Sequence, residues 1–138
     1  MVAGTGNGLS RLLLVVGRLP SAEVGPIHLH YGEEVLHVVS GRLLVRAGDH
    51  RRECGPGEVV AVPAGTWHGF RALEETVLEV VAQQRIGTVF PVRDEDGCVE
   101  LVEVHRMDMP WGRPPPEGGD WTTDTDMRGI LDALDMEV

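Results

Sequence analysis

The segment "HLHYGEEVLHVVSG", residues 28–41, decides the fold because it gathers possible metal ligands on two neighbouring strands. Side chains of a strand alternate between its two faces, so His28 and His30 point the same way. After a turn, Glu34 begins the second strand and can reach the same point. Two imidazoles and one carboxylate on one face predict a site for a divalent first-row metal ion.

A second segment, "GEVVAVPAGTWHGF" at residues 57–70, offers a fourth ligand. His68 follows a proline–glycine corner and lies on a strand of that segment, on the same face as Phe70. We therefore predict that one ion is bound by His28, His30, Glu34 and His68. Fe(II) and Mn(II) are the expected ions, with Ni, Zn and Co as alternatives.

Residues 12–92 consist of short apolar or alternating segments separated by glycine and proline. Strands that recur about every 8–12 residues with such turns predict an antiparallel sandwich or barrel. The expected strands are Leu12–Val16, Ile27–Tyr31, Val35–Val39, Leu43–Arg46, Val59–Val62, Trp67–Arg71 and Val77–Ala82.

The two ligand segments resemble the paired motifs of the cupin family. The first motif reads His28-x-His30, three residues, Glu34, six residues and Gly41. The second reads Gly57, five residues, Pro63-x-Gly65, two residues and His68. The sequence departs from the family at turns, with Ala72 where an asparagine is usual and Gly25 close ahead of His28. The resemblance implies an all-β fold, a double-stranded β-helix with a jelly-roll-like barrel, and the same four residues as metal ligands.

The composition changes near residue 92, which predicts a barrel over residues 1–92 and an acidic extension over residues 93–138. Residues 98–104 alternate like one more strand, whereas the prolines of "PWGRPPPEGGDW" at 110–121 exclude regular structure. Met127, Ile130, Leu131 and Leu134 follow at helical spacing, with Thr123 or Asp124 as the N-cap. The extension is therefore expected to end in a short helix that packs on the barrel or on a partner subunit.

Several residues around the predicted ligands are candidates for a substrate pocket or for catalysis. Glu79 would be a buried general base if its strand turns that side chain inward, and a half-exposed residue if it does not. His37 is expected to point away from the metal, because alternation places Glu34 on the opposite face. The expected apolar pocket walls, which predict a small and partly hydrophobic organic substrate, are Leu36, Val38, Val62, Phe70 and Leu78.

The composition excludes several kinds of partner. The net charge is −10, and 13 of the 22 acidic residues lie in residues 94–138 beside three arginines, so nucleic-acid binding is not expected. No apolar run approaches the roughly 18–20 residues that cross a bilayer, and no signal-peptide pattern is found. The only cysteines, Cys54 and Cys98, have no metal-binding spacing, so a cytoplasmic protein with reduced thiols is expected.

Four protein ligands leave positions open on an ion that prefers five or six, which is typical of a catalytic or ligand-binding site. An oxygenase or dioxygenase reaction on a small organic molecule is the first hypothesis. A non-redox isomerase, cyclase or lyase and a non-catalytic small-molecule-binding module are the alternatives, because cupins share a fold and not a function. By analogy with small cupins we expect a homodimer, with Val35, Val39 and Leu44 facing outward.

Overall fold

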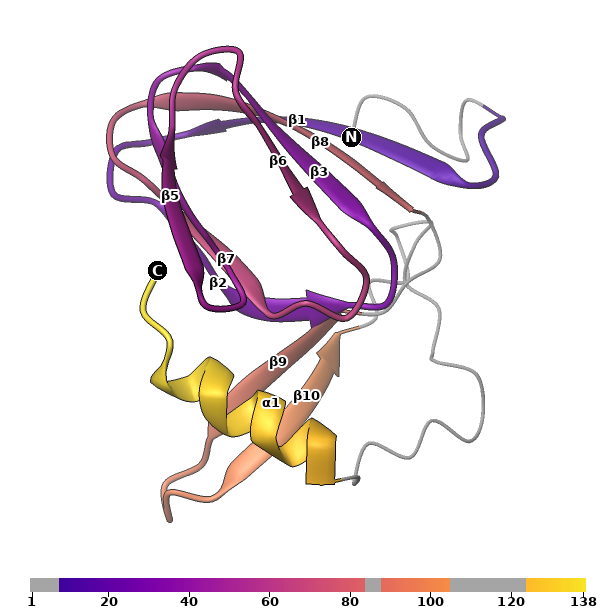
Figure 1. Cartoon of the computed structure of the whole chain (residues 1–138), viewed down its shortest axis with the longest axis vertical. Helices are drawn as coiled ribbons and strands as arrows, with labels where there is room; N and C mark the ends of the chain where they lie inside the picture. The colour runs from indigo at the N-terminus through magenta and orange to yellow at the C-terminus, as the bar shows by residue number, and fades with distance from the viewer. Residues whose placement is uncertain (1–7, 84–87, 105–123) are drawn as a thin grey trace.

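The computed structural model describes residues 8–83, 88–104 and 124–138, which form ten strands and one helix (Figure 1). The strands are β1 Leu12–Leu19, β2 Val24–His30, β3 Glu34–Ser40, β4 Leu43–Ala47, β5 His50–Cys54, β6 Val59–Val62, β7 His68–Ala72, β8 Thr76–Gln83, β9 Thr88–Arg93 and β10 Val99–Val104, followed by the helix α1 Asp124–Asp135. The strands form a four-stranded sheet of order β1-β8-β3-β6 and a six-stranded sheet of order β10-β9-β2-β7-β4-β5. All their pairings are antiparallel, and the predicted all-β fold with a short terminal helix is confirmed.

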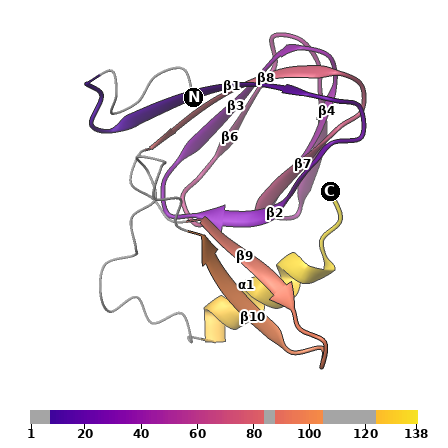
Figure 2. The same ribbon diagram turned by 180° about the vertical axis from the view of Figure 1, so that it is seen from behind.

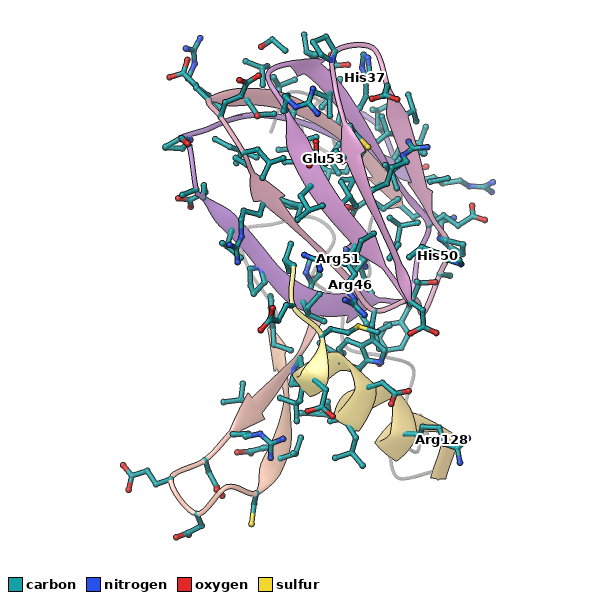
Figure 3. All side chains as sticks on the ribbon, turned by 60° about the vertical axis from the view of Figure 1, so that its left-hand side comes forward. His37, Arg46, His50, Arg51, Glu53 and Arg128 are labelled. Carbon is teal, nitrogen blue, oxygen red and sulfur yellow. The ribbon has the colours of Figure 1, made fainter. Side chains whose placement is uncertain are left out.

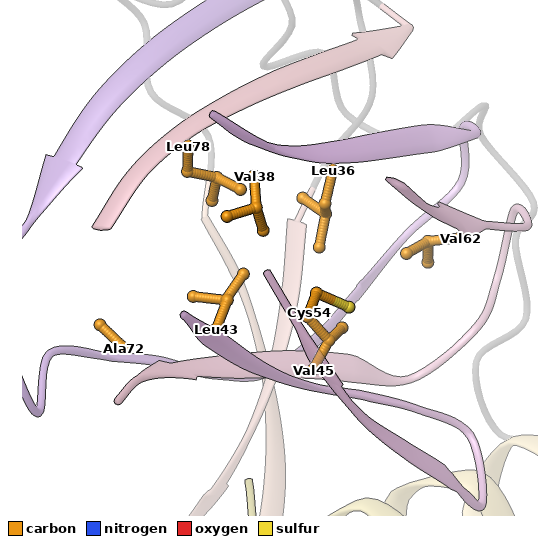
Figure 4. Packing of buried hydrophobic residues seen from close by; sticks show 8 residues of the cluster. All are labelled: Leu36, Val38, Leu43, Val45, Cys54, Val62, Ala72 and Leu78. Carbon is orange, nitrogen blue, oxygen red and sulfur yellow. The ribbon is translucent and has the colours of Figure 1, made fainter. Parts of the chain in front are cut away.

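The main core lies between the two sheets, and side chains from both fill it (Figure 4). Successive side chains of each contributing strand alternate between the two faces of its sheet, and those on the inward face pack in this core. The buried members are Leu36, Val38, Leu43, Val45, Cys54, Val62, Ala72 and Leu78. These side chains hold together the strands that carry the predicted ligands.

One turn of the barrel requires glycine. Gly41, between β3 and β4, has a φ of 87°, in the left-handed region that favours glycine. A Cβ atom at this position would also collide with the backbone carbonyl of Glu75 and with Thr76. The glycine that ends the first motif therefore lets the chain turn against the start of β8.

Two strands of the structure were missing from the sequence prediction. The segment of β5 contains mostly charged residues and has no apolar alternation, as is common for a strand at the edge of a sheet. The segment of β9 contains Pro91, which weakens a strand signal. The predicted strand at 98–104 is confirmed as β10, which pairs with β9. The sheet thus continues past residue 92, the predicted domain boundary, which falls within β9.

Helix α1 contacts β2, β9 and β10 on the outer side of the six-stranded sheet (Figures 1 and 2). A second, smaller core forms there from Ile27, Ala133 and Val138, with Trp67 and Met136 packed against it. The predicted apolar stripe of the helix was partly wrong. Ile130 is buried as expected, but Leu131 is 48% exposed, and the small Ala133 is buried instead. No helix within the described ranges is long and apolar enough to cross a membrane.

Candidate metal centre

The two histidines of the first motif owe their direction to an irregularity in β2. Gly25 pairs with Phe70 of β7, and the next pair in the register joins His28 to His68. The three-residue step on β2 matches two residues on β7, which is a β-bulge. The bulge places Gly25 beside the Phe70 ring and His28 beside His68, while Ile27 packs toward α1 on the other face. A regular strand could not turn both Gly25 and His28 inward.

Three imidazoles converge where β2 pairs with β7. One ring nitrogen from each of His28, His30 and His68 lies within 4.8 Å of the other two. The ring centroids are 4.3 Å apart for His28 and His68, and 4.7 Å apart for His30 and His68. Two nitrogens on one ion, each about 2.1 Å from it, are at most about 4.2 Å apart. Small side-chain adjustments would therefore bring all three onto a single ion.

Backbone carbonyls fix the orientation of two of these rings. The Nδ1 atom of His28 lies 2.6 Å from the carbonyl oxygen of Pro26, and Nδ1 of His68 lies 2.8 Å from that of Thr66. Because a carbonyl can only accept, Nδ1–H is the donor and Nε2 keeps its lone pair. The Nε2 atom of His68 is buried and has no hydrogen-bond partner among the described residues. A buried lone pair of this kind suits a metal ion.

Glu34 lies at the start of β3 and is 8% exposed. Its Oε2 atom is 2.8 Å from Nε2 of His30, and its Oε1 atom is 3.7 Å from Nε2 of His68. Burial by itself would raise the pKa of Glu34, but its contacts with the two imidazoles outweigh burial and hold that pKa well below its usual range. The carboxylate is therefore charged at neutral pH.

His28 has the complementary protonation state. Burial, together with the nearby His68 and His30 rings, lowers the pKa of His28 from 6.5 to about 4. Metal ions bind neutral imidazole and ionised carboxylate. The chemistry of these donors therefore fits a divalent transition metal ion at neutral pH.

Comparison with known proteins identifies the family to which the chain belongs. The sequence profile described as "Cupin domain" matches residues 15–83, which is half of the chain. This chain belongs to the cupin family. The profile spans both ligand motifs and ends with β8. No curated protein sequence matches the chain.

Among solved structures, this cupin is similar to TT1209 from Thermus thermophilus, with 28% identity over 53% of this chain and 72% of that chain, and a TM-score of 0.51. It is likewise similar to KdgF from a Halomonas species, with 28% identity over 54% of this chain and 71% of that chain, and a TM-score of 0.51. An RmlC-like cupin from Shewanella frigidimarina shares the fold at 22% identity, over 53% of this chain and 66% of that chain, with a TM-score of 0.52.

The structure contradicts an inward position for Glu79, the candidate general base. Glu79 is the cross-strand neighbour of His37, and its carboxylate lies 2.8 Å from Nδ1 of that histidine. Their side chains are 39% and 37% exposed and lie on the outer face of the four-stranded sheet, where Figure 3 shows His37. On β8 the inward positions belong to Leu78 and Val80, which pack in the main core, so alternation sends Glu79 outward.

The five predicted pocket residues face the barrel interior, but four of them are packed core. Leu36, Val38, Val62 and Leu78 are no more than 3% exposed and contact one another in the main cluster. Phe70 is only partly buried, and its ring lies over Gly25. Of the five, Phe70 is therefore the residue that a bound molecule could contact.

Two residues beside the histidines were missed in the sequence, because β9 was not recognised. Thr88 is the cross-strand neighbour of His30, so the two side chains share a face. The ring of Phe90 lies 5.5 Å from that of His28, between centroids. Thr88 is buried and Phe90 partly buried. The alternation of Thr88 and Phe90 before Pro91 was the signal that could have identified them.

Proposed function

We propose that this cupin binds one divalent transition metal ion through His28, His30, Glu34 and His68 and uses it in an oxygenase or dioxygenase reaction on a small organic molecule. The observation that carries the proposal is the convergence of three imidazole donors within 4.8 Å of one another. The ionised carboxylate of Glu34 lies beside two of them. The main core of the barrel consists of apolar side chains.

Fe(II) and Mn(II) are the ions we expect first, with Ni, Zn and Co as alternatives. Three imidazoles and one carboxylate leave one or two positions for other molecules on an ion that prefers five or six ligands. Such an ion supplies a Lewis acid and, if it is iron, a redox centre for dioxygen chemistry. The partly buried rings of Phe70 and Phe90 offer apolar contacts for the organic substrate.

The surroundings of the ligands favour oxygen chemistry over isomerisation or cyclisation. Proton transfer to or from a substrate carbon usually needs a positioned acid or base. Glu79, the candidate for that role, pairs with His37 on the outer surface. Beyond the four proposed ligands, the described residues include no buried carboxylate or imidazole. An oxygenase reaction depends less on a positioned acid or base than isomerisation or cyclisation does.

The test begins with elemental analysis of protein purified without added metal. We expect one divalent ion per chain, lost in Glu34→Ala and in His68→Ala. His37→Ala is the matched control, because it removes a histidine of the same motif that lies on the outer surface. Metal that persists in both ligand variants would contradict the site.

If the ion is iron, oxygen uptake with diketones, catechols and flavonoids tests the reaction. Uptake that depends on the substrate and disappears in His68→Ala is the expected result. An iron-loaded protein that binds such molecules without consuming oxygen would favour the binding-module alternative. Turnover with zinc or manganese but without oxygen would favour non-redox chemistry.

We also propose that two copies associate through the outer face of the four-stranded sheet. Apolar side chains surround the His37–Glu79 pair on that face and are between 36% and 49% exposed: Val16, Val35, Val39, Val59 and Val81. Leu44, expected to join them, belongs to β4 of the other sheet. Light scattering after size exclusion should give a dimer mass, and a monomer in Val35→Asp. A monomeric wild-type protein would contradict the proposal.

A further inference from the structure

The residue that precedes the fourth proposed ligand is held by the C-terminal helix. The backbone carbonyl of Trp67 accepts a hydrogen bond of 2.8 Å from the amide of Gly48. The indole ring of Trp67 lies against Gly129 of α1, where a Cβ atom would come within 2.7 Å of Nε1. Glycine inside a helix is unfavourable compared with alanine. Its place in α1 is explained by the indole, which occupies the space that a side chain would need.

The same C-terminal segment contacts the residue after His68 and the residue before His28. A Cβ atom on Gly69, directly after His68, would lie 2.9 Å from a methyl group of Val138. Ala133 and Val138 pack on Ile27, directly before His28. In addition, Arg46 donates a hydrogen bond of 3.3 Å to the backbone carbonyl of Glu137. The segment thus packs behind the two strands that present His28 and His68.

The contact between Trp67 and α1 is linked to the His68 imidazole through only a few covalent bonds of the backbone. The carbonyl that accepts from Nδ1 of His68 belongs to Thr66, the residue before Trp67. A shift of the indole would move this carbonyl and the Cα atom of His68 together. Groups that orient a ligand ring typically change metal affinity by about 10- to 100-fold when they are disturbed.

We propose that α1 positions the metal centre and that the Trp67–Gly129 contact sets the place of the His68 imidazole. Trp67 and Gly129 are positioning residues, because neither lies among the converging ring nitrogens. The proposal rests on the metal site of the proposed function, but it makes a separate statement, namely that a helix outside the barrel controls how tightly the ion is held.

The test is a Co(II) titration of the full, metal-free chain, followed by the visible absorption that reports the coordination of the ion. Gly129→Ala should weaken Co(II) binding by about 10-fold or more and alter the absorption band. A merely structural role for α1 predicts that the clash with the indole changes the melting temperature and leaves the Co(II) affinity unchanged. Adding Trp67→Phe, which shrinks the ring and makes room for the new methyl group, should restore most of the affinity.

Two controls separate positioning from general destabilisation. Leu131→Ala changes a 48% exposed residue of the same helix and should leave Co(II) affinity unchanged. Leu78→Ala removes a core side chain on a strand that carries no proposed ligand; it should lower the melting temperature without the loss of Co(II) affinity. Wild-type affinity in Gly129→Ala would overturn the positioning role alone, as would an equal loss in Leu78→Ala. Failure of the wild-type chain to bind one Co(II) would overturn the metal site and this proposal together.

Discussion

His28 should make the metal-free protein lose stability in mild acid. Burial and the neighbouring imidazoles lower the pKa of His28 from 6.5 to about 4. Between these two values the unfolded chain binds the proton more readily than the folded chain does. The free energy of unfolding therefore falls as the pH drops through this window, and the contribution is fully present only above the unfolded value. At 1.36 kcal/mol per pKa unit, the linkage relation gives a loss of about 2 kcal/mol at pH 5 relative to pH 7.5.

Urea unfolding of chelator-treated protein at pH 7.5 and pH 5 measures this loss. In His28→Asn the amide can still donate to the carbonyl of Pro26, but no proton is taken up, so the loss should shrink by about 2 kcal/mol. His50→Asn, at an exposed histidine of the edge strand β5, is the matched control and should keep the full loss. Glu34 does not disturb the comparison, because its lowered pKa makes its own contribution fall away at more acid pH.

An unchanged loss of stability in His28→Asn would refute the reasoning. It would mean that His28 is well hydrated or already protonated in the folded protein, contrary to its packing against His68 and Phe90. A loss that vanished equally in His50→Asn would point to the net charge of the chain instead of to the imidazole of His28.

Three further substitutions test other parts of the structure. Glu34→Gln keeps the side-chain shape but removes the charge, and should weaken metal binding roughly a hundredfold by calorimetry, corresponding to about 3 kcal/mol; equal affinity would remove Glu34 from the ligand set. Leu36→Ala opens a cavity in the main core and should lower the free energy of unfolding, measured in urea, by about 2–5 kcal/mol. A change near zero would show that this side chain is not tightly packed. Gly41→Ala forces a side chain into the left-handed region and against the Glu75 carbonyl, so we expect about 1–3 kcal/mol of destabilisation or more; a neutral result would mean that the turn differs.

The sequence alone was sufficient for the fold class and for the three histidines that converge. In the first motif the ligands are close in the chain, and strand alternation determines which side chains share a face. Alternation also separated His37 from the candidate ligands, as the structure shows. The motif glycines and the proline–glycine corner mark the turns that join the strands. These signals are local and are therefore visible in one sequence.

The tertiary structure decided what depends on pairing between distant strands. The direction of Glu79 follows from the register of β8 on β3, and a register shift of one residue would have reversed it. Thr88 and Phe90 join the histidines only because β9 pairs with β2. Gly129 meets Trp67 across more than 60 residues of chain, and neither residue carries a signal of that contact in the sequence. Periodicity specifies which faces of a segment are alike, whereas the packing of segments against one another specifies what each face meets.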